Sequence, residues 1–173
     1  MTIHSDHPFL EPESERDPLR RLRGRLGGTV SLWTCGSGPA RAGLTVSSLM
    51  LGGGEPPHAL ALVDPDSDYA SALLSEGSSV VQLLEWSHRD LADAFAGIAP
   101  APGGVFTLGS WTDTAWGPRL TDAPAWAGVR LVDAREVGWS LLVDTVVEHI
   151  DITEERSPLV HRRGRYVRPD KRN

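Results

Sequence analysis

The chain has 173 residues, of which 40% are hydrophobic and 23% charged, and its net charge is −6 at pH 7. This length suffices for one domain with its own core, and the acidic balance argues against a general nucleic-acid-binding protein. The single cysteine, Cys35, rules out an intrachain disulfide and a cysteine-based zinc site. No apolar run approaches the ~20 residues that cross a bilayer, and the N-terminus lacks the pattern of a signal peptide. A cytoplasmic protein without membrane contact is therefore expected.

The N-terminal part of the chain is predicted to be an irregular acidic arm over residues 1–17. Asp17 and Pro18 have the residue types expected at the cap and in the first turn of a helix. The basic segment 18–26 is predicted to continue that helix until two glycines end it.

A hairpin is predicted next: a strand over 29–35, a glycine-rich turn, and a second strand that starts near Arg41. The second strand alternates apolar side chains with three small hydroxyls, at Thr45, Ser47 and Ser48. A half-exposed strand usually carries charged side chains on its wet face. Small side chains instead allow a planar ring to approach the backbone, while hydroxyls and strand N–H and C=O groups bind the polar edge of a heterocycle. The pattern therefore favours a heterocyclic ligand.

A possible phosphate site follows this hairpin in the sequence. A strand over 58–64 is predicted to lead into a short helix ending at Gly77, with Asp66 or Ser67 as its cap. Free N–H groups at a helix N-terminus suit a phosphate. The acidic side chains beside this one leave a purely structural cap as the alternative.

The rest of the chain is predicted to be mainly extended, with one short amphipathic helix within 88–97. The further extended segments are 78–86, 105–111, 129–137, 139–152 and 159–167. About seven strands with only short helices indicate a mainly β fold, a closed or nearly closed barrel. Residues 18–168 are expected to form a single domain, followed by a basic tail over 169–173.

Side chains alone give little support for catalysis. The six histidines show no metal-ligand spacing and the chain has no GxSxG motif, so no metal site and no serine nucleophile are expected. A bound cofactor would supply the chemistry instead, and the protein would position it.

Several segments together resemble the flavin reductase family, which has an FMN-binding split barrel. They are GLTVSS, PPHALALVDPDSDYASALLSEGSSVVQLL, LADAFAG, GPRLTDAPAWAGVRLVDA and SPLVHRRGRYV. Their order and spacing carry the resemblance over about residues 20–168. It implies a six-stranded Greek-key barrel with short helices at its ends, assembled as a homodimer with FMN near the subunit interface.

The resemblance also implies a set of cofactor-binding residues. The strand would lie along the isoalloxazine ring and the ribityl chain, Ser67 would bind the phosphate, and Arg41 would neutralise the phosphate or an edge of the reduced ring. The full set is Arg41, Leu44, Thr45, Val46, Ser47, Ser48, Ser67, Tyr69 and Ala70.

Two positions depart from the family's pattern. Gln82 stands where the family usually has Asn. Gly138-Trp139-Ser140 stands where many members have Gly-Asp-His, whose histidine lies near the nicotinamide. Trp139 would stack on the flavin or the nicotinamide, fill the nicotinamide's pocket, or point into the core. His161, on a predicted strand, is the second candidate near the ring. The catalytic residues stay open, since the flavin itself carries the chemistry.

The function that follows is an NAD(P)H-dependent flavin reductase that passes electrons from FMN, or alternatively FAD, to free flavin or to a partner monooxygenase. Two alternatives remain at this point. One is a flavin-binding carrier or sensor without NAD(P)H turnover, and the other is a split-barrel relative that binds deazaflavin or haem.

Overall fold

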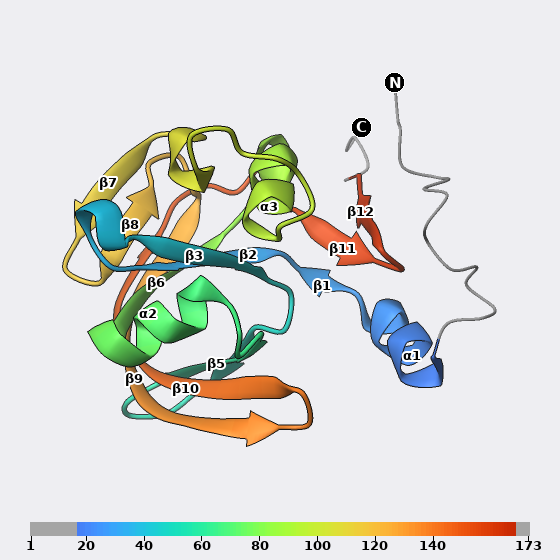
Figure 1. Cartoon of the computed structure of the whole chain (residues 1–173), viewed down its shortest axis with the longest axis horizontal. Coiled ribbons are helices and arrows are strands. Elements are labelled where there is room, and N and C mark those ends of the chain that lie inside the picture. Colours follow the sequence, from blue (N-terminus) through green and yellow to red (C-terminus); the bar gives the residue numbers. More distant parts are fainter. Residues whose placement is uncertain (1–16, 169–173) are drawn as a thin grey trace.

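The computed structural model describes residues 17–168, so most of the predicted arm (1–16) and the tail (169–173) lie outside the described residues. The main element is a seven-stranded antiparallel sheet in the order β3-β2-β6-β9-β10-β5-β4 (Figure 1). Its strands are β2 (Ser31–Cys35), β3 (Ala42–Val46), β4 (Met50–Gly52), β5 (His58–Val63), β6 (Ser78–Leu83), β9 (Ala125–Val137) and β10 (Ser140–Ile152). The prediction of a mainly β fold with short helices is confirmed. None of the helices within 17–168 is long and apolar enough to cross a membrane.

The sheet curves until its two ends meet. The Ser48 hydroxyl, just after β3, donates to the carbonyl of Leu62 and accepts from its N–H, both at 2.9 Å. Because Leu62 belongs to β5, these bonds hold the end of β3 against β5, the last strand but one at the other side of the sheet. Six strands, β2, β3, β5, β6, β9 and β10, correspond to the expected six-stranded barrel, and the three-residue strand β4 adds a seventh by pairing with β5.

Two helices cover the barrel. Helix α2 (Asp68–Glu76) begins at Ser67, whose hydroxyl accepts from the Ala70 N–H, and ends at Gly77 in the left-handed conformation. Helix α3 (Arg89–Phe95) follows the short turn η2 (Trp86–His88) and lies over β3. A side chain at Gly43 would collide with the Phe95 ring at 2.6 Å, so only glycine permits α3 to pack this closely on β3.

The hydrophobic core has two parts. The larger one fills the barrel beneath α2 and contains Trp33, Tyr69, Leu73, Val129 and Val143, all at most 1% exposed. The smaller one lies beneath α3. Its buried members are Val30, Leu32, Leu84, Leu91, Ala92, Phe95, Leu120, Ala123 and Leu159.

A second, small sheet lies to one side of the barrel, on the right in Figure 1. It has the order β1-β11-β12, formed by β1 (Gly28–Thr29), β11 (Val160–Arg162) and β12 (Arg165–Val167). The prediction of one continuous strand over 159–167 is wrong. Arg163 and Gly164 both have positive φ and turn the chain into a hairpin.

Helix α1 (Pro18–Leu26) adjoins this small sheet, with Asp17 as its cap as predicted. It buries none of its residues, and its backbone meets the hairpin where the Arg163 N–H donates to the Gly24 carbonyl at 2.7 Å. Four arginines of α1 and four of the hairpin segment gather here, and neither 18–29 nor 159–168 contains an acidic residue. This region, α1 with β11–β12 and Arg168, is called the arginine end below.

The prediction that residues 105–111 are extended is also wrong for most of this segment. Val105–Thr107 forms a 3₁₀ turn, η3, and only Trp111 belongs to a strand, β7 (Trp111–Thr114), which pairs with β8 (Gly117–Leu120). Three glycines with positive φ, at 103, 104 and 109, bend the backbone away from an extended course.

Candidate functional site

The hydroxyl-rich strand β3 is an edge strand. Its residues 42–46 pair with β2, and among the described residues they make no backbone hydrogen bond to any other element. An antiparallel edge strand keeps part of its N–H and C=O groups free along its outer side. Helices α2 and α3 both approach this strand. The outer side of β3 therefore offers main-chain donors and acceptors between two helices.

One end of this strand carries the three hydroxyls, and each has a different environment. Ser47 is exposed, and no hydrogen bond of the described residues involves its hydroxyl. The Thr45 hydroxyl donates to the carbonyl of Ala92 in α3 at 2.6 Å, and Ser48 bonds Leu62 as described above. Ser47 is thus the hydroxyl free for a ligand, whereas Thr45 and Ser48 hold α3 and β5 in place.

The other end of β3 lies beside the first turn of α2. The Cys35 thiol is 4.0 Å from the Tyr69 carbonyl, and Cys35 pairs with Ala42, the first residue of β3. Arg41 comes immediately before Ala42, so its backbone lies at this end of the strand. Its Nε donates to the Gly38 carbonyl at 3.0 Å.

The Arg41 guanidinium also lies over the Phe106 ring, 4.9 Å from its centre. Cation–π contact and the bond from Nε fix the side chain while its terminal nitrogens make no hydrogen bond to the described residues. A fixed cation at this end of β3 is suited to an anionic group.

The electrostatics of the α2 start are mixed. The first N–H groups of a helix have no intrahelical partners, and here Ser67 satisfies only that of Ala70. Asp64, Asp66 and Asp68 surround the same turn and oppose the binding of an anion. The Ser67 hydroxyl is itself engaged, because it donates to the Asp64 carbonyl at 2.7 Å.

Four of the predicted cofactor-binding residues have side chains turned toward the protein interior. Val46, Tyr69 and Ala70 are at most 2% exposed, and Leu44 packs against the barrel core. The Tyr69 hydroxyl lies 2.9 Å from the Ser79 hydroxyl, and burial raises the pKa of Tyr69 well above its usual value. Because these four side chains occupy the apolar faces of β3 and α2, a contact between these residues and a ligand, which stays a prediction, would be made by their backbone groups.

His161, although far away in the sequence, lies near the end of β3 that carries the three hydroxyls, called the hydroxyl end below. It pairs with Gly28, and a side chain at Gly28 would meet the Ser47 carbonyl at 3.5 Å. The His161 ring packs edge-on against Tyr166, whose hydroxyl donates to Asp93 of α3 at 2.7 Å. Sequence reasoning missed Gly28 and Ala92 as neighbours of this end, because Gly28 is placed by the pairing of β1 with β11 and Ala92 by the packing of α3 on β3.

Trp139 lies apart from these residues, at the tip of the β9–β10 hairpin, and is 99% exposed. The alternative that placed it in the core is wrong. Gly138, with φ of 58°, supplies the tight turn that presents the indole to solvent. Leu141, two residues later, pairs with Val63 directly before the turn into α2. Among residues 17–168, the indole fills no pocket.

Among residues 17–168, no group of three or more potential ligand side chains is arranged to hold a metal ion. The lone cysteine, Cys35, is buried, and burial raises the pKa of its thiol to about 12. The described part of the chain thus contains neither a cluster of metal ligands nor a reactive thiol.

The barrel, with its edge strand β3 between α2 and α3, defines the class of protein as a split barrel. The model of the flavin reductase like domain family matches residues 23–170. The chain belongs to this family.

Individual relatives of the chain are also named as reductases. The chain is 32% identical over 128 residues to an FMN reductase (NADH), RutF, of Ancylobacter novellus, a match that covers 73% of this chain and 70% of the relative. It is 25% identical over 154 residues to the reductase component of 4-hydroxyphenylacetate 3-monooxygenase of Pseudomonas aeruginosa, covering 88% and 89%.

Solved structures share the fold. The NADH:FAD oxidoreductase SgcE6 of Streptomyces globisporus superimposes with a TM-score of 0.81 at 23% identity, covering 95% of this chain and 98% of that one. The flavin reductase PheA2 gives a TM-score of 0.80 at 22% identity, covering 90% and 100%.

Proposed function

We propose that this protein is a flavin reductase that binds FMN along β3 and uses NADH as its electron donor. The observation that carries the proposal is the unpaired outer side of β3, with the free Ser47 hydroxyl at one end and Arg41 with the start of α2 at the other. Membership of the flavin reductase like domain family and relatives named FMN reductase (NADH) support it.

The residues fit an elongated ligand with one polar heterocyclic end and one anionic end. Five residues of β3 span ~17 Å at about 3.3 Å per residue. The Ser47 hydroxyl and free strand groups would bind the ring's polar edge, and Arg41 with the first N–H groups of α2 would bind the phosphate. The aspartates of the α2 start would weaken phosphate binding, which favours a flavin that exchanges over one held permanently.

When bound, the flavin would accept a hydride from NADH and hold two electrons. The chain's own part is to orient the ring and to exclude water from its inner side. The Thr45 bond to Ala92 and the close approach of Phe95 to Gly43 hold α3 in a fixed position beside the strand. His161 stands near the hydroxyl end, where it would assist in placing the nicotinamide.

The proposed flavin reductase function also implies protein partners. A relative is the reductase component of a monooxygenase, which supports delivery of reduced flavin to an oxygenase. A homodimer is proposed as well, since the apolar side chains of Met50 and Leu62 are exposed on one face of the paired strands β4 and β5, and that of Leu51 is exposed on the other. FAD is the second flavin to consider, and NADPH the second donor.

The test is anaerobic reduction of the purified protein with FMN, using NADH and NADPH separately. Loss of the oxidised-flavin absorbance band with NADH at catalytic protein concentration is the expected result. Binding of FMN without bleaching by either nucleotide would favour a carrier or sensor. A Soret band, or binding of a deazaflavin in preference to FMN, would contradict the proposal.

A further inference from the structure

A cavity adjoins the start of β3, between the turn η1 (Gly38–Ala40) and the turn η3. Its volume is about 340 Å³. Small-molecule sites usually have about 300–1,000 Å³, so this space suits one nucleotide-sized group rather than a whole dinucleotide. Arg41, the residue directly before β3, is the one charged side chain among the described residues that line the cavity.

The Arg41 side chain is fixed from one side. Its Nε donates to the Gly38 carbonyl at 3.0 Å, and its guanidinium lies over the Phe106 ring at 4.9 Å. Phe106 in turn packs edge-on against Phe95 of α3, with the ring centres 5.1 Å apart. The terminal nitrogens of Arg41 make no hydrogen bond to any of residues 17–168. Arg41 therefore brings a positioned planar cation with unused donors to the cavity.

The electrostatic surroundings of the cavity favour an anion. The protein has a net charge of −6, yet the two segments that contribute the lining residues, 36–54 and 99–112, contain no acidic residue. The start of α2 differs, because Asp64, Asp66 and Asp68 surround it. A phosphate group in the cavity therefore meets no carboxylate from these two segments, and Arg41 attracts it.

The walls of the cavity suit a flat ring. Gly38, Gly103 and Gly104 line it with positive φ, a backbone conformation that favours glycine, so the walls carry no side chain at these positions. Pro39 and Val105 add apolar surface. A guanidinium plane next to such walls is suited to stacking on an aromatic heterocycle.

A phosphate joined to a planar heterocycle is the chemistry of an adenylate group. In FAD, an adenylate is attached to the phosphate of the FMN half. That phosphate is proposed above to lie at Arg41, so the adenylate would continue from the point where the cavity begins.

We propose that the cavity beside Arg41 binds the adenylate half of FAD, so that the protein binds FAD more tightly than FMN. The inference rests on the flavin binding proposed for the outer side of β3, which concerns the FMN half that both flavins share. The terminal nitrogens of Arg41 donate to the pyrophosphate, and the adenine lies against the guanidinium between the glycine walls.

Calorimetric titration of the purified protein with FMN and with FAD tests the proposal. FAD is expected to bind about 2- to 30-fold more tightly, which is the range that one stacking contact with a cation supplies. The flavin ring and the first phosphate are the same in both ligands. The ratio of the two dissociation constants therefore isolates the contribution of the adenylate.

Two variants separate stacking from charge. Arg41→Lys keeps the cation and loses the planar guanidinium, so FMN binding is expected to change little while the preference for FAD disappears. Thr107→Trp fills the cavity from an exposed lining position and is expected to have the same effect. A thermal melt of each variant shows that it is folded.

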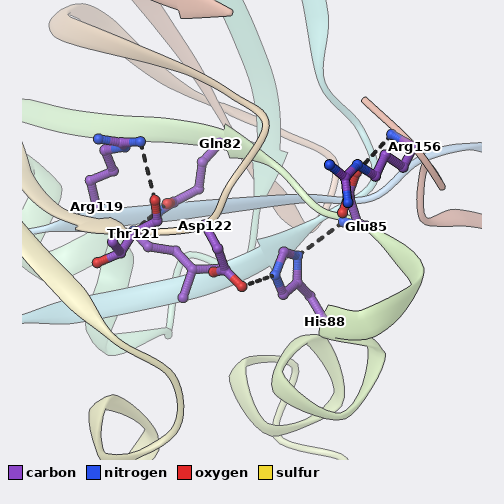
Figure 2. Close-up of polar contacts among 8 residues, drawn as sticks. Gln82, Glu85, His88, Arg119, Thr121, Asp122 and Arg156 are labelled. Carbon is purple, nitrogen blue, oxygen red and sulfur yellow. Dashed lines mark hydrogen bonds and ion pairs between the residues drawn. The ribbon is translucent and has the colours of Figure 1, made fainter. Parts of the chain in front are cut away.

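Arg119→Lys is the matched control. Like Arg41, Arg119 lies over an aromatic ring, that of Trp126 at 5.3 Å, and donates to a main-chain carbonyl, that of Thr121 at 3.3 Å (Figure 2). Arg119 belongs to β8 and does not line the cavity. This variant is expected to keep the wild-type ratio of FAD to FMN affinity.

Equal affinity for FAD and FMN in the wild-type protein would overturn this inference and leave the proposed function standing. Binding of neither flavin would overturn both. A preference for FAD that survives in Arg41→Lys and in Thr107→Trp would place the adenylate outside the cavity. A higher KM for NADH in Arg41→Lys, at an unchanged ratio of flavin affinities, would assign the cavity to the adenylate of the electron donor instead.

Discussion

The Gln82 side chain accepts a hydrogen bond from the Leu120 N–H at 2.7 Å, which joins β6 to β8 inside the protein. The same amide donates to the Thr34 hydroxyl at 3.0 Å, and that hydroxyl donates to the Pro118 carbonyl. Gln82 is completely buried. The glutamine that replaces the family's usual asparagine thus holds the β7–β8 hairpin on the barrel.

Replacing Gln82 with Leu should destabilise the fold by about 2–4 kcal/mol, because it leaves the Leu120 N–H and the Thr34 hydroxyl without one of their partners. Urea unfolding measures this as a lower midpoint with an unchanged slope. A midpoint within experimental error of the wild type would refute the structural role.

Ser47 and Thr45 should separate flavin affinity from stability. Ser47→Ala removes a free hydroxyl and is expected to weaken FMN binding by about 0.5–1.5 kcal/mol at unchanged stability. Thr45→Val removes the bond to Ala92 and is expected to lower stability by a similar amount. Fluorescence titration with FMN and a thermal melt distinguish them. If Ser47→Ala binds FMN as well as the wild type, the backbone of β3 holds the ring without this side chain.

Trp139 should contribute little to stability. A surface substitution of this kind changes the free energy of unfolding by at most about 0.5 kcal/mol, so Trp139→His should melt as the wild type does. Because the indole lies apart from β3, NADH should reduce this variant at the wild-type rate. Single-turnover reduction under anaerobic conditions measures the rate. Faster reduction with a normal melt would instead place the indole where the nicotinamide approaches the flavin.

His161 should make the fold less stable in mild acid. Burial lowers the pKa of His161, with the Asp93 carboxylate partly opposing the shift. A histidine whose folded pKa lies below its unfolded value of about 6.5 contributes full stability above that pH and loses it as the pH falls through the folded pKa. His161→Gln should therefore show a flatter loss of stability below pH 6.5 than the wild type. Urea midpoints from pH 5 to 8 supply the comparison, and parallel curves would exclude the effect.

The elements that the sequence predicts well are those with local signals. Asp17 and Pro18 mark the start of α1, and Gly77 marks the end of α2, because cap chemistry is local. The segments that it predicts wrongly depend on φ angles or distant contacts. Arg163 adopts φ of 54°, a left-handed conformation that is uncommon for residues other than glycine. An arginine in the sequence does not predict it, so the β11–β12 turn is missed.

The candidate site likewise has features that the sequence predicts and features that depend on packing. The hydroxyl pattern points to β3, but the sequence cannot tell that Thr45 bonds Ala92 while Ser47 stays free, because this depends on where α3 packs. Tyr69 had a signal that was available: it shares a helical face with Leu73, four residues on, which predicts burial. The cavity beside Arg41 had none, since η1 and η3 meet only in the folded protein.

The arginine end gives the described part of the protein an uneven charge distribution. Among residues 17–168 it holds eight arginines, and the cap Asp17 is the one acidic residue directly beside their two segments, so most acidic residues of this part lie on other segments. A molecule with such a charge distribution is oriented by the electrostatic field of a charged partner before the two make contact. At about 0.1 M salt, screening limits this orienting force to about 10 Å. Encounters with an anionic molecule should therefore begin at α1 and the β11–β12 hairpin, whichever surface completes the contact.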